Sequence, residues 1–245
     1  MSILPPDTDE ERIEDPRFII TFSPGAHYWS VAVGRLRFDT PKVADAVADI
    51  RALMQARDRD AAVWSVGGSA TPADLADRLT GLGLEREGTS DVLILSHPPA
   101  RGVAEAFEVR EVRSLEDLHA WIDVSAEAFG WSGDDASDER TRAEDTWRMG
   151  VGGSTIRLMA LDDGRPVAVA RASRSPHGLY LGGMATLPSD RRRGAMTALV
   201  AATWDAAARD GTPAVVAYGG SMSAPGFLRL GFETTGRVVH LIDRL

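Results

Sequence analysis

The chain has 245 residues, 44% hydrophobic and 26% charged, which allows a substantial buried core and excludes a disordered type of chain. Its formal net charge of −9 argues against nucleic acid or an anionic membrane surface as a partner, because both require a basic face. The absence of cysteine excludes disulfides, thiolate metal sites and a cysteine nucleophile, and we expect no metal cofactor.

The N-terminal segment, residues 1–15, is typical of a flexible tail. It is acidic and contains proline, and it lacks the charged-then-apolar layout of a signal peptide. No apolar run in the chain approaches the length of a membrane span. We therefore expect a cytoplasmic protein with no membrane partner.

Residues 16–104 alternate segments typical of strands and of helices. β-Branched and aromatic residues predict strands over 18–22, 28–33, 61–66 and 92–95. The spacing of apolar residues predicts a helix over 41–57, after Thr40 as N-cap, and a second helix from Thr71 to Gly83. The proline-containing stretch 97–105 is the best candidate for a linker.

Residues 105–245 contain the rest of the predicted elements. Strands are predicted over 107–112, 156–161, 167–172, 179–187, 214–218 and 238–242. The dipeptide Asp163-Gly164 is a common hairpin turn between the second and third of these. Helices are predicted after the N-cap Ser114, over 139–149 behind an acidic loop at 130–138, over 194–209, and in a short segment ending at Gly231. The tryptophans at 64, 121 and 204 fall on apolar faces and are predicted to be core residues.

Two segments of the chain repeat the same order of features. In the first half, AVWSVGGSATP precedes RLTGLGLEREG, and in the second half AVVAYGGSMSAP precedes FLRLGFETTG. Turn chemistry alone explains the glycines, but not the shared succession of strand, turn, helix, glycine and strand. We infer a degenerate duplication.

The most informative segment is GLYLGGMATLPSDRRRGAMTALVAATWDAA, in which a strand leads through a tight turn into a helix. The first N–H groups of a helix have no internal partner, and the helix dipole adds partial positive charge there. Gly194 lets an anion approach the backbone closely, and the arginines at 191, 192 and 193 add cations. This combination suits a pyrophosphate.

This segment resembles the phosphate loop of the GNAT (N-acetyltransferase) superfamily, written Arg/Gln-x-x-Gly-x-Gly/Ala, except that Met196 stands in the last position. The preceding GGMATLP is similar to the family's fourth strand, and the downstream APGFLRLGF is similar to its short helix and Gly-Phe ending. The resemblance covers roughly Phe107 to Leu245.

The resemblance implies an α/β fold, a GNAT-like mixed sheet flanked by helices at 105–245, with a smaller α/β domain at 16–104 that is similar to a truncated copy. That copy has Arg37-Phe38-Asp39-Thr40-Pro41 in place of the phosphate loop. It is therefore expected to bind no CoA and to cover or extend the C-terminal sheet.

The resemblance also implies acetyl-CoA as the acyl donor. Backbone groups of Met184, Ala185 and Thr186 would bond the pantetheine arm. Arg191, Arg192, Arg193, Gly194, Ala195 and Met196 would bind the pyrophosphate. Ser221 and Ser223 would lie near the thioester, and Phe227 would pack beside the pantetheine.

Two positions depart from the family's catalytic pattern. Tyr180 stands where a glutamate base is common, and a tyrosine with a pKa near 10 is a poor base. His177 is the nearby group that titrates in the right range, although a hairpin-turn histidine in water is the more ordinary interpretation. Phe227 replaces the tyrosine that protonates the leaving thiolate. We carry Tyr180 and His177 forward as candidate catalytic residues.

The loop that would wall the acceptor site contains Phe129 and Trp131 beside carboxylates at 134, 135, 138 and 139. Aromatic rings beside carboxylates suit a cationic amine, whereas a solvated acidic loop is the alternative interpretation. We therefore expect an acyl-CoA-dependent N-acyltransferase that acetylates a small-molecule amine. The alternatives are a CoA-binding sensor or structural module with little turnover, and a protein or peptide N-acetyltransferase.

Overall fold

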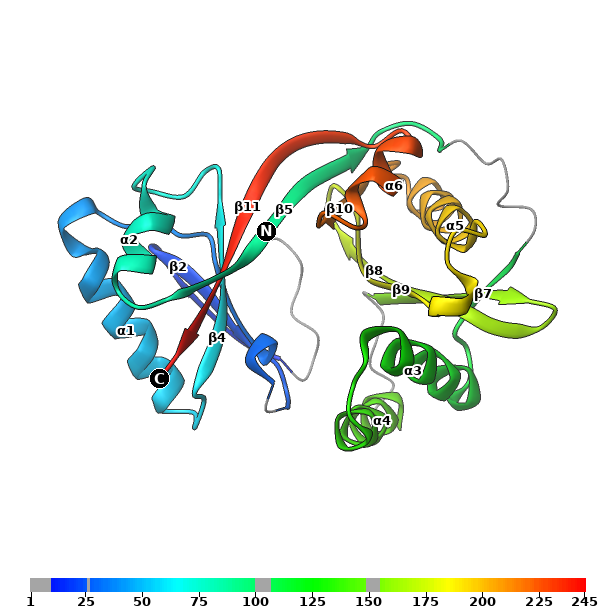
Figure 1. Cartoon of the computed structure of the whole chain (residues 1–245), viewed down its shortest axis with the longest axis horizontal. Helices are drawn as coiled ribbons and strands as arrows, with labels where there is room; N and C mark the ends of the chain where they lie inside the picture. Colours follow the sequence, from blue (N-terminus) through cyan, green and yellow to red (C-terminus); the bar gives the residue numbers. More distant parts are fainter. Residues whose placement is uncertain (1–9, 26, 100–106, 149–154) are drawn as a thin grey trace. The chain divides into compact units, whose positions relative to one another are not determined.

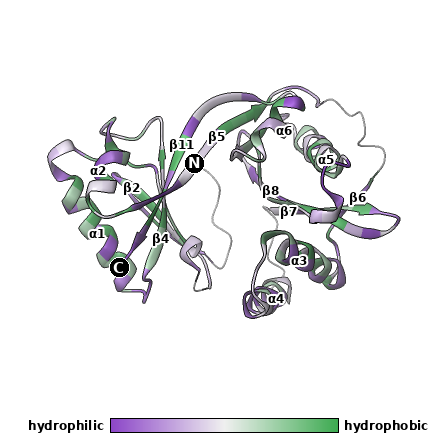
Figure 2. Cartoon of the chain, viewed as in Figure 1, coloured by the Kyte–Doolittle hydropathy of each residue, from purple (hydrophilic) through white to green (hydrophobic). Residues whose placement is uncertain are grey.

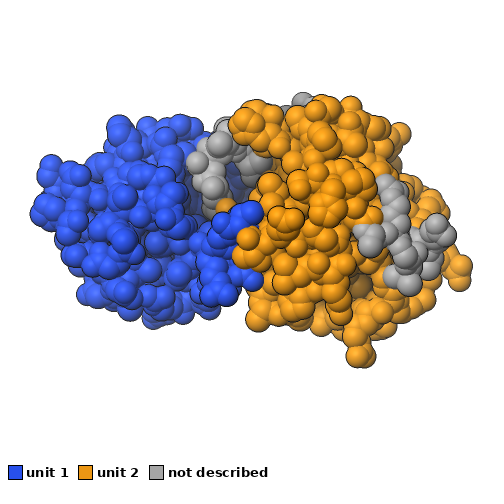
Figure 3. Space-filling model, turned by 90° about the horizontal axis from the view of Figure 1, so that it is seen from above, with its two compact units in different colours: residues 1–92, 235–245 blue, residues 93–234 orange. Residues whose placement is uncertain are grey.

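The computed structural model describes residues 10–25, 27–99, 107–148 and 155–245 (Figure 1). The chain forms two compact units: unit 1 comprises Met1–Val92 with Thr235–Leu245, and unit 2 comprises Leu93–Thr234 (Figure 3). These units differ from the expected ranges 16–104 and 105–245. The reason is that β5 (Glu85–Leu95) begins in unit 1 and ends in unit 2, while β11 (Glu233–Arg244) does the reverse.

Unit 1 is a sheet with helices packed on one face. The sheet runs in the order β1-β2-β3-β4-β11-β5. Its other elements are β1 (Glu11–Asp15), β2 (Phe18–Phe22), β3 (Val31–Gly34), β4 (Ala61–Gly67), α1 (Val43–Gln55) and α2 (Leu75–Gly81), with 3-10 turns η1 (Tyr28–Ser30) and η2 (Thr40–Lys42). β3 and β4 are parallel, and β11 is antiparallel to β4. Apolar residues of both helices and of the C-terminal strand share one core, which includes Ile50, Trp64, Leu79 and Leu241.

The predicted flexible tail at 1–15 is wrong in its last part, because residues 11–15 form β1, antiparallel to β2. The turn between these strands is closed by Asp15, whose carboxylate accepts hydrogen bonds from the backbone N–H and the guanidinium of Arg17. Ile13 packs against the core, so the strand is held by both polar and apolar contacts. Most of the expected tail, residues 1–9, lies outside the described residues, as does most of the expected linker 97–105.

The C-terminal strand is an integral part of unit 1. Residues Val238 to Arg244 pair one by one with Gly67 to Ala61 of β4. The carboxylate of Asp243 is fully buried and accepts hydrogen bonds from the Arg51 guanidinium of α1, the shortest at 2.6 Å. Removing one partner of such a pair leaves a buried charge without compensation, which makes the pair a strong constraint on the position of the strand.

Unit 2 is a sheet with helices on both faces. The end of β5 lies beside β10, and the order continues β10-β9-β8-β7-β6. Its other elements are β6 (Glu108–Glu111), α3 (Leu115–Phe129), α4 (Gly133–Arg148), β7 (Thr155–Asp162), β8 (Arg165–Ser175), β9 (Gly178–Thr186), η4 (Pro188–Asp190), α5 (Ala195–Arg209), β10 (Val215–Gly219) and α6 (Ala224–Arg229). Only β9 and β10 pair in parallel among the ladders from β6 to β10.

Two separate apolar clusters fix the layers of unit 2. One joins α5 and α6 to the sheet and includes Leu93 and Leu95 from the end of β5, and the other joins α3 to the opposite face. Figure 2 shows that helices of both units carry hydrophobic and hydrophilic residues together, as helices that cover one face of a sheet must. Among the described residues, no helix is long and apolar enough to span a membrane.

Several sequence-based predictions are confirmed in detail. Asp163 and Gly164 both have positive φ, at 48° and 81°, in the turn between β7 and β8. The Ser114 side chain accepts a hydrogen bond from the backbone N–H of Asp117 at 3.0 Å, so it is the N-cap of α3. The tryptophans at 64, 121 and 204 are all buried.

The predicted acidic loop at 130–138 is wrong, because α4 already begins at Gly133. The side chain of Ser132 accepts from the backbone N–H of Asp135, and the carboxylate of Asp135 accepts from the backbone N–H of Ser132. This reciprocal pair is a capping box, with aspartate in the position where glutamate is usual. The end of the predicted helix, Met149, lies outside the described residues.

The same succession of elements occurs in both units, in keeping with a degenerate duplication. β3-α1-β4-α2 in unit 1 corresponds to β9-α5-β10-α6 in unit 2, and both strand pairs are parallel. The strand that follows each short helix, β5 or β11, ends in the core of the other unit. The two halves have therefore exchanged their closing strands.

Candidate active site

The parallel strands β9 and β10 diverge partway along β9. Their register pairs Leu179 to Leu181 with Val215 to Ala217. β9 continues to Thr186, where its other edge still pairs with β8, but in the described chain no residue of β10 pairs with β9 beyond Leu181. Met184, Ala185 and Thr186 thus lie on the part of β9 that is free of β10, and their backbone groups on that edge can bond a ligand.

A bulge in β9 coincides with this divergence. The register with β8 shifts between Val169 and Arg171, which face Ala185 and Gly182 respectively. Gly183 has φ +54°, a backbone conformation that residues other than glycine adopt only with strain. Gly182-Gly183 therefore bends β9 at the point where it leaves β10.

The predicted anion loop connects β9 to α5 through η4. Arg191 is extended and Arg192 has φ +65°, and the chain then reaches Gly194, the N-cap of α5, at φ +105°. Only glycine adopts this φ without strain, and any other residue would place its side chain beside the first turn of the helix. The N–H groups of the first turn of this 15-residue helix have no partner within the helix.

The three arginines of the loop have different environments. Arg193 donates to Asp162 and to the buried Asp190, both at 2.7 Å, so its guanidinium holds the turn in shape. The pKa of the Asp190 carboxyl lies below its usual range because it accepts hydrogen bonds from Ser189 first, then from Arg165 and Arg193. Arg191 and Arg192 are exposed, and no carboxylate among the described residues pairs with either; Arg191 donates through Nε to the backbone carbonyl of Thr186 at 3.3 Å, which leaves its other guanidinium N–H groups for a phosphate.

Met196 has a specific neighbour in α6. A Cβ added to Gly226 would lie 2.9 Å from the Met196 sulfur, so the glycine leaves the space that this side chain fills. The larger side chain at position 196 is therefore accommodated by a glycine of α6. Ala195, the neighbouring position, is buried in the core beneath the loop.

Two tyrosines meet at the divergence of the strands. The rings of Tyr180 on β9 and Tyr218 on β10 are 5.5 Å apart in an edge-to-face arrangement. Tyr180 lies over Gly182, whose added Cβ would be 3.0 Å from the ring and 3.6 Å from the hydroxyl oxygen. Neither hydroxyl has a hydrogen-bond partner within the described residues.

The electrostatics of both tyrosines favour the neutral hydroxyl. Burial raises the pKa of Tyr180, an effect that the charge of Arg171 partly offsets. Burial, and then the neighbouring Tyr180, raise the pKa of Tyr218 to about 12. At neutral pH both groups are hydrogen-bond donors, and neither is a base.

Sequence reasoning did not single out Tyr218. A signal was present, because Tyr218 follows Ala217 on the predicted strand 214–218 and alternation turns its side chain away from the core face; the pairing with β9 then places it on the face of Tyr180.

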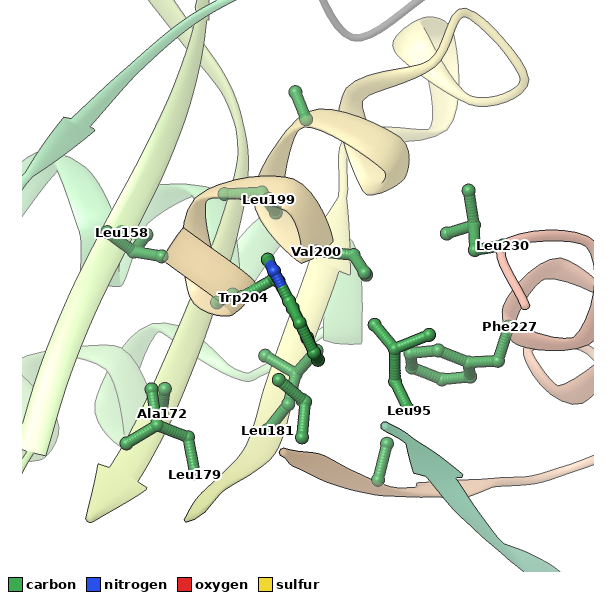
Figure 4. Packing of buried hydrophobic residues seen from close by; sticks show 14 of the residues in the cluster. Leu95, Leu158, Ala172, Leu179, Leu181, Leu199, Val200, Trp204, Phe227 and Leu230 are labelled. Carbon is green, nitrogen blue, oxygen red and sulfur yellow. The ribbon is translucent and has the colours of Figure 1, made fainter. Parts of the chain in front are cut away.

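The other predicted residues lie in different surroundings. His177 is exposed in the β8–β9 turn, and seven strand residues, roughly 23 Å of extended chain, separate it from Met184. Ser221 is exposed in the turn after β10, and Ser223 precedes α6 without capping it through its side chain. Phe227 is 3% exposed and packs edge-to-face on Phe232 at 4.9 Å. Figure 4 shows its ring beside Leu95.

The acidic residues near α4 are largely engaged with their own neighbours. Asp135 belongs to the capping box, and Glu139 pairs with Arg142 of the same helix. Phe129 is 52% exposed and stacks on Trp131 with centroids 6.2 Å apart. Within the described residues, no group of three or more His, Asp or Glu side chains could hold a metal.

Comparison with known proteins gives one family match and several structural ones. The model of the Acetyltransferase (GNAT) family matches residues 116–232. A search of curated proteins finds no significant match.

Three solved structures share the fold over almost the whole chain. A GCN5-related N-acetyltransferase from Kribbella flavida has a TM-score of 0.70 at 19% identity, covering 96% of this chain and 90% of its own. One from Sphaerobacter thermophilus has a TM-score of 0.64 at 17% identity, covering 93% and 80%. A tandem GNAT protein from the clavulanic acid biosynthesis pathway has a TM-score of 0.62 at 17% identity, covering 93% and 78%.

Proposed function

We infer that this chain, whose residues 116–232 form a domain of the GNAT acetyltransferase family, transfers the acetyl group of acetyl-CoA to a small-molecule amine. At the general level the family consists of acyl-CoA-dependent N-acyltransferases that use acetyl-CoA as co-substrate. The observation that carries the proposal is the joint placement of two features in unit 2: the divergence of β9 from β10, and the Gly194 N-terminus of α5 that follows it.

The proposed donor site extends along one path. Pantetheine would lie along the free edge of β9 at Met184, Ala185 and Thr186. The pyrophosphate would reach the free N–H groups at Gly194 to Met196. Arg191 and Arg192 would add charge, while Arg193 would act through the turn that it holds with Asp190.

The proposed chemistry is direct attack of the amine nitrogen on the thioester carbonyl carbon. The C–S bond breaks as the C–N bond forms, the thiolate leaves, and the amine loses a proton to water. Tyr180 and Tyr218 are neutral donors at the divergence, so they suit the developing negative charge on oxygen or sulfur. Tyr218 would then serve where the tyrosine expected at position 227 is missing. His177 is too far along β9 for a direct role.

The proposal is tested by measuring thiol release from acetyl-CoA with a panel of primary amines. The chain has three tyrosines, and the third, Tyr28, donates to Glu87 in unit 1, so Tyr28→Phe is a matched control. We expect Tyr218→Phe to lower kcat by roughly 10²-fold, with a smaller change in KM for acetyl-CoA. The control should leave both constants unchanged.

Two results would count against this function. Acetyl-CoA binding without acetylation of any amine would favour the alternative of a CoA-binding module. Acetylation of peptide N-termini or lysines in preference to free amines would favour the protein acetyltransferase. Equal kcat values in Tyr218→Phe and the wild type would remove Tyr218 from the mechanism and leave the transfer itself intact.

A further inference from the structure

One arginine on the sheet of unit 2 lacks the partner that its neighbours have. β8 carries three arginines within its bounds: Arg165 pairs with Asp190 at 3.0 Å and Arg174 pairs with Asp210 at 2.8 Å. Arg171 is exposed, and none of the carboxylates in the described ranges pairs with it. An exposed guanidinium without a carboxylate partner can bind an anion, and what distinguishes Arg171 from other exposed arginines is its place on the sheet.

Arg171 lies on the same face of the sheet as the two tyrosines. It is the direct partner of Gly182 across the β8–β9 ladder, and directly paired residues project from the same face. A Cβ added to Gly183 would be 3.7 Å from the Arg171 Cβ, and the Tyr180 ring lies over Gly182. The charge of Arg171 acts on the Tyr180 hydroxyl strongly enough to oppose the effect of burial on its pKa. The opposite face, reached by Ala170 and Ala172, packs on α5.

This position is separate from the proposed phosphate site. Gly182 precedes Thr186 by four strand residues, roughly 13 Å, and the anion loop begins only after η4. A phosphate held at the first turn of α5 therefore does not satisfy Arg171. Arg171 instead lies beside Gly182 and Gly183, near the Tyr180 that is proposed to meet the reacting thioester.

We propose that Arg171 binds a carboxylate carried by a substrate of the transfer, either on the acceptor amine or on the acyl group of the donor. This inference rests on the proposed function, and it narrows the substrate class from amines in general to a reaction in which one partner is anionic. It also replaces the expectation of a cationic acceptor. Two of the carboxylates expected to bind such an acceptor are already engaged, Asp135 in the capping box of α4 and Glu139 in an ion pair with Arg142. A planar guanidinium donates two parallel hydrogen bonds to a carboxylate, which an exposed position near the Tyr180 hydroxyl would allow.

The test measures equilibrium binding to the full chain, so that it does not depend on turnover. In the first arm, the affinities of a set of N-acetyl amino acids for the protein are compared with those of the corresponding N-acetyl amino acid amides, with and without CoA. In the second arm, the affinity of succinyl-CoA is compared with that of acetyl-CoA. Each titration is repeated with Arg171→Gln and with Arg174→Gln, which removes the same charge from the opposite face of the same strand.

We expect one carboxylate-bearing ligand to bind more tightly than its uncharged counterpart, and Arg171→Gln to weaken that ligand alone by roughly 10- to 100-fold. Arg174→Gln should leave all affinities unchanged. Preference in the first arm assigns the carboxylate to the acceptor, and preference in the second assigns it to the acyl group. The proposal is overturned if neither arm shows a preference, or if Arg171→Gln weakens charged and uncharged ligands equally. Failure of acetyl-CoA to bind would contradict the proposed function, while the first arm without CoA still decides the role of Arg171.

Discussion

The exchange of closing strands predicts that the second half of the chain does not fold alone. A fragment comprising residues 104–245 would contain the whole GNAT match, yet it would lack Leu93 and Leu95, which are both fully buried in the core of unit 2. It would also retain residues 235–245 without β4, to which Val238–Arg244 pair in the intact chain.

The magnitude follows from burial. Each fully buried leucine contributes about 1.5–3 kcal/mol, so the two together contribute roughly 3–6 kcal/mol. A domain of this size is typically stable by only about 5–15 kcal/mol, so the loss removes a large part of the stability. The fragment additionally exposes the apolar side chains of β11, such as Leu241, which favours aggregation.

The assay is thermal and urea unfolding of the fragment 104–245 beside the full chain and a second fragment, residues 91–234. The second fragment keeps Leu93 and Leu95 and omits most of β11. We expect the first fragment to aggregate or to unfold without a cooperative transition, and the second to be the more soluble of the two. A cooperative 104–245 fragment with a Tm within a few degrees of the full chain would refute the reasoning.

Two further predictions concern stability within each unit. Gly226→Ala places a Cβ 2.9 Å from the sulfur of the flexible Met196 side chain, which must shift, so it should lower the free energy of unfolding by at most about 1 kcal/mol. The same change should cost less in a Met196→Ala background, and an equal cost in both backgrounds would contradict the contact. His240 is hydrogen-bonded to Ser65 and Ser90, and burial lowers its pKa against the opposing charge of Glu87. The unfolded chain therefore binds this proton more readily, so stability is present above the unfolded pKa of about 6.5 and is lost as pH falls through the folded pKa. Tm measured from pH 8 to pH 5 should fall less steeply in His240→Gln, and parallel curves would contradict this assignment.

Local signals in the sequence were sufficient for most elements and for the donor loop. The turn at Asp163-Gly164, the N-cap Ser114 and the glycine at the start of α5 each depend on backbone chemistry within a few residues, which a sequence displays directly. The bulge at Gly182-Gly183 was not predicted, because the sequence indicated a strand over 179–187 and no shift in its register.

Features that depend on distant parts of the chain could not be predicted in the same way. The pairing of β11 with β4 joins residues far apart in sequence, and nothing in VVHLI distinguishes it from a strand of unit 2. The acidic character of residues 130–138 favoured a loop, because the capping box formed by Ser132 and Asp135 was not recognised as a helix start. Arg171 is conspicuous only once the ion pairs of the other β8 arginines are known.

The central claim is that acetyl-CoA binds along β9 and at the N-terminus of α5, and direct calorimetric titration tests it. Gly194→Glu places a carboxylate at the first turn of α5, where φ is +105°. Gly211→Glu is the control, because Gly211 follows the other end of α5 with φ +78° and has open space around it. We expect Gly211→Glu to retain the wild-type Kd for acetyl-CoA and Gly194→Glu to show no measurable binding. A wild-type Kd in folded Gly194→Glu would contradict the account.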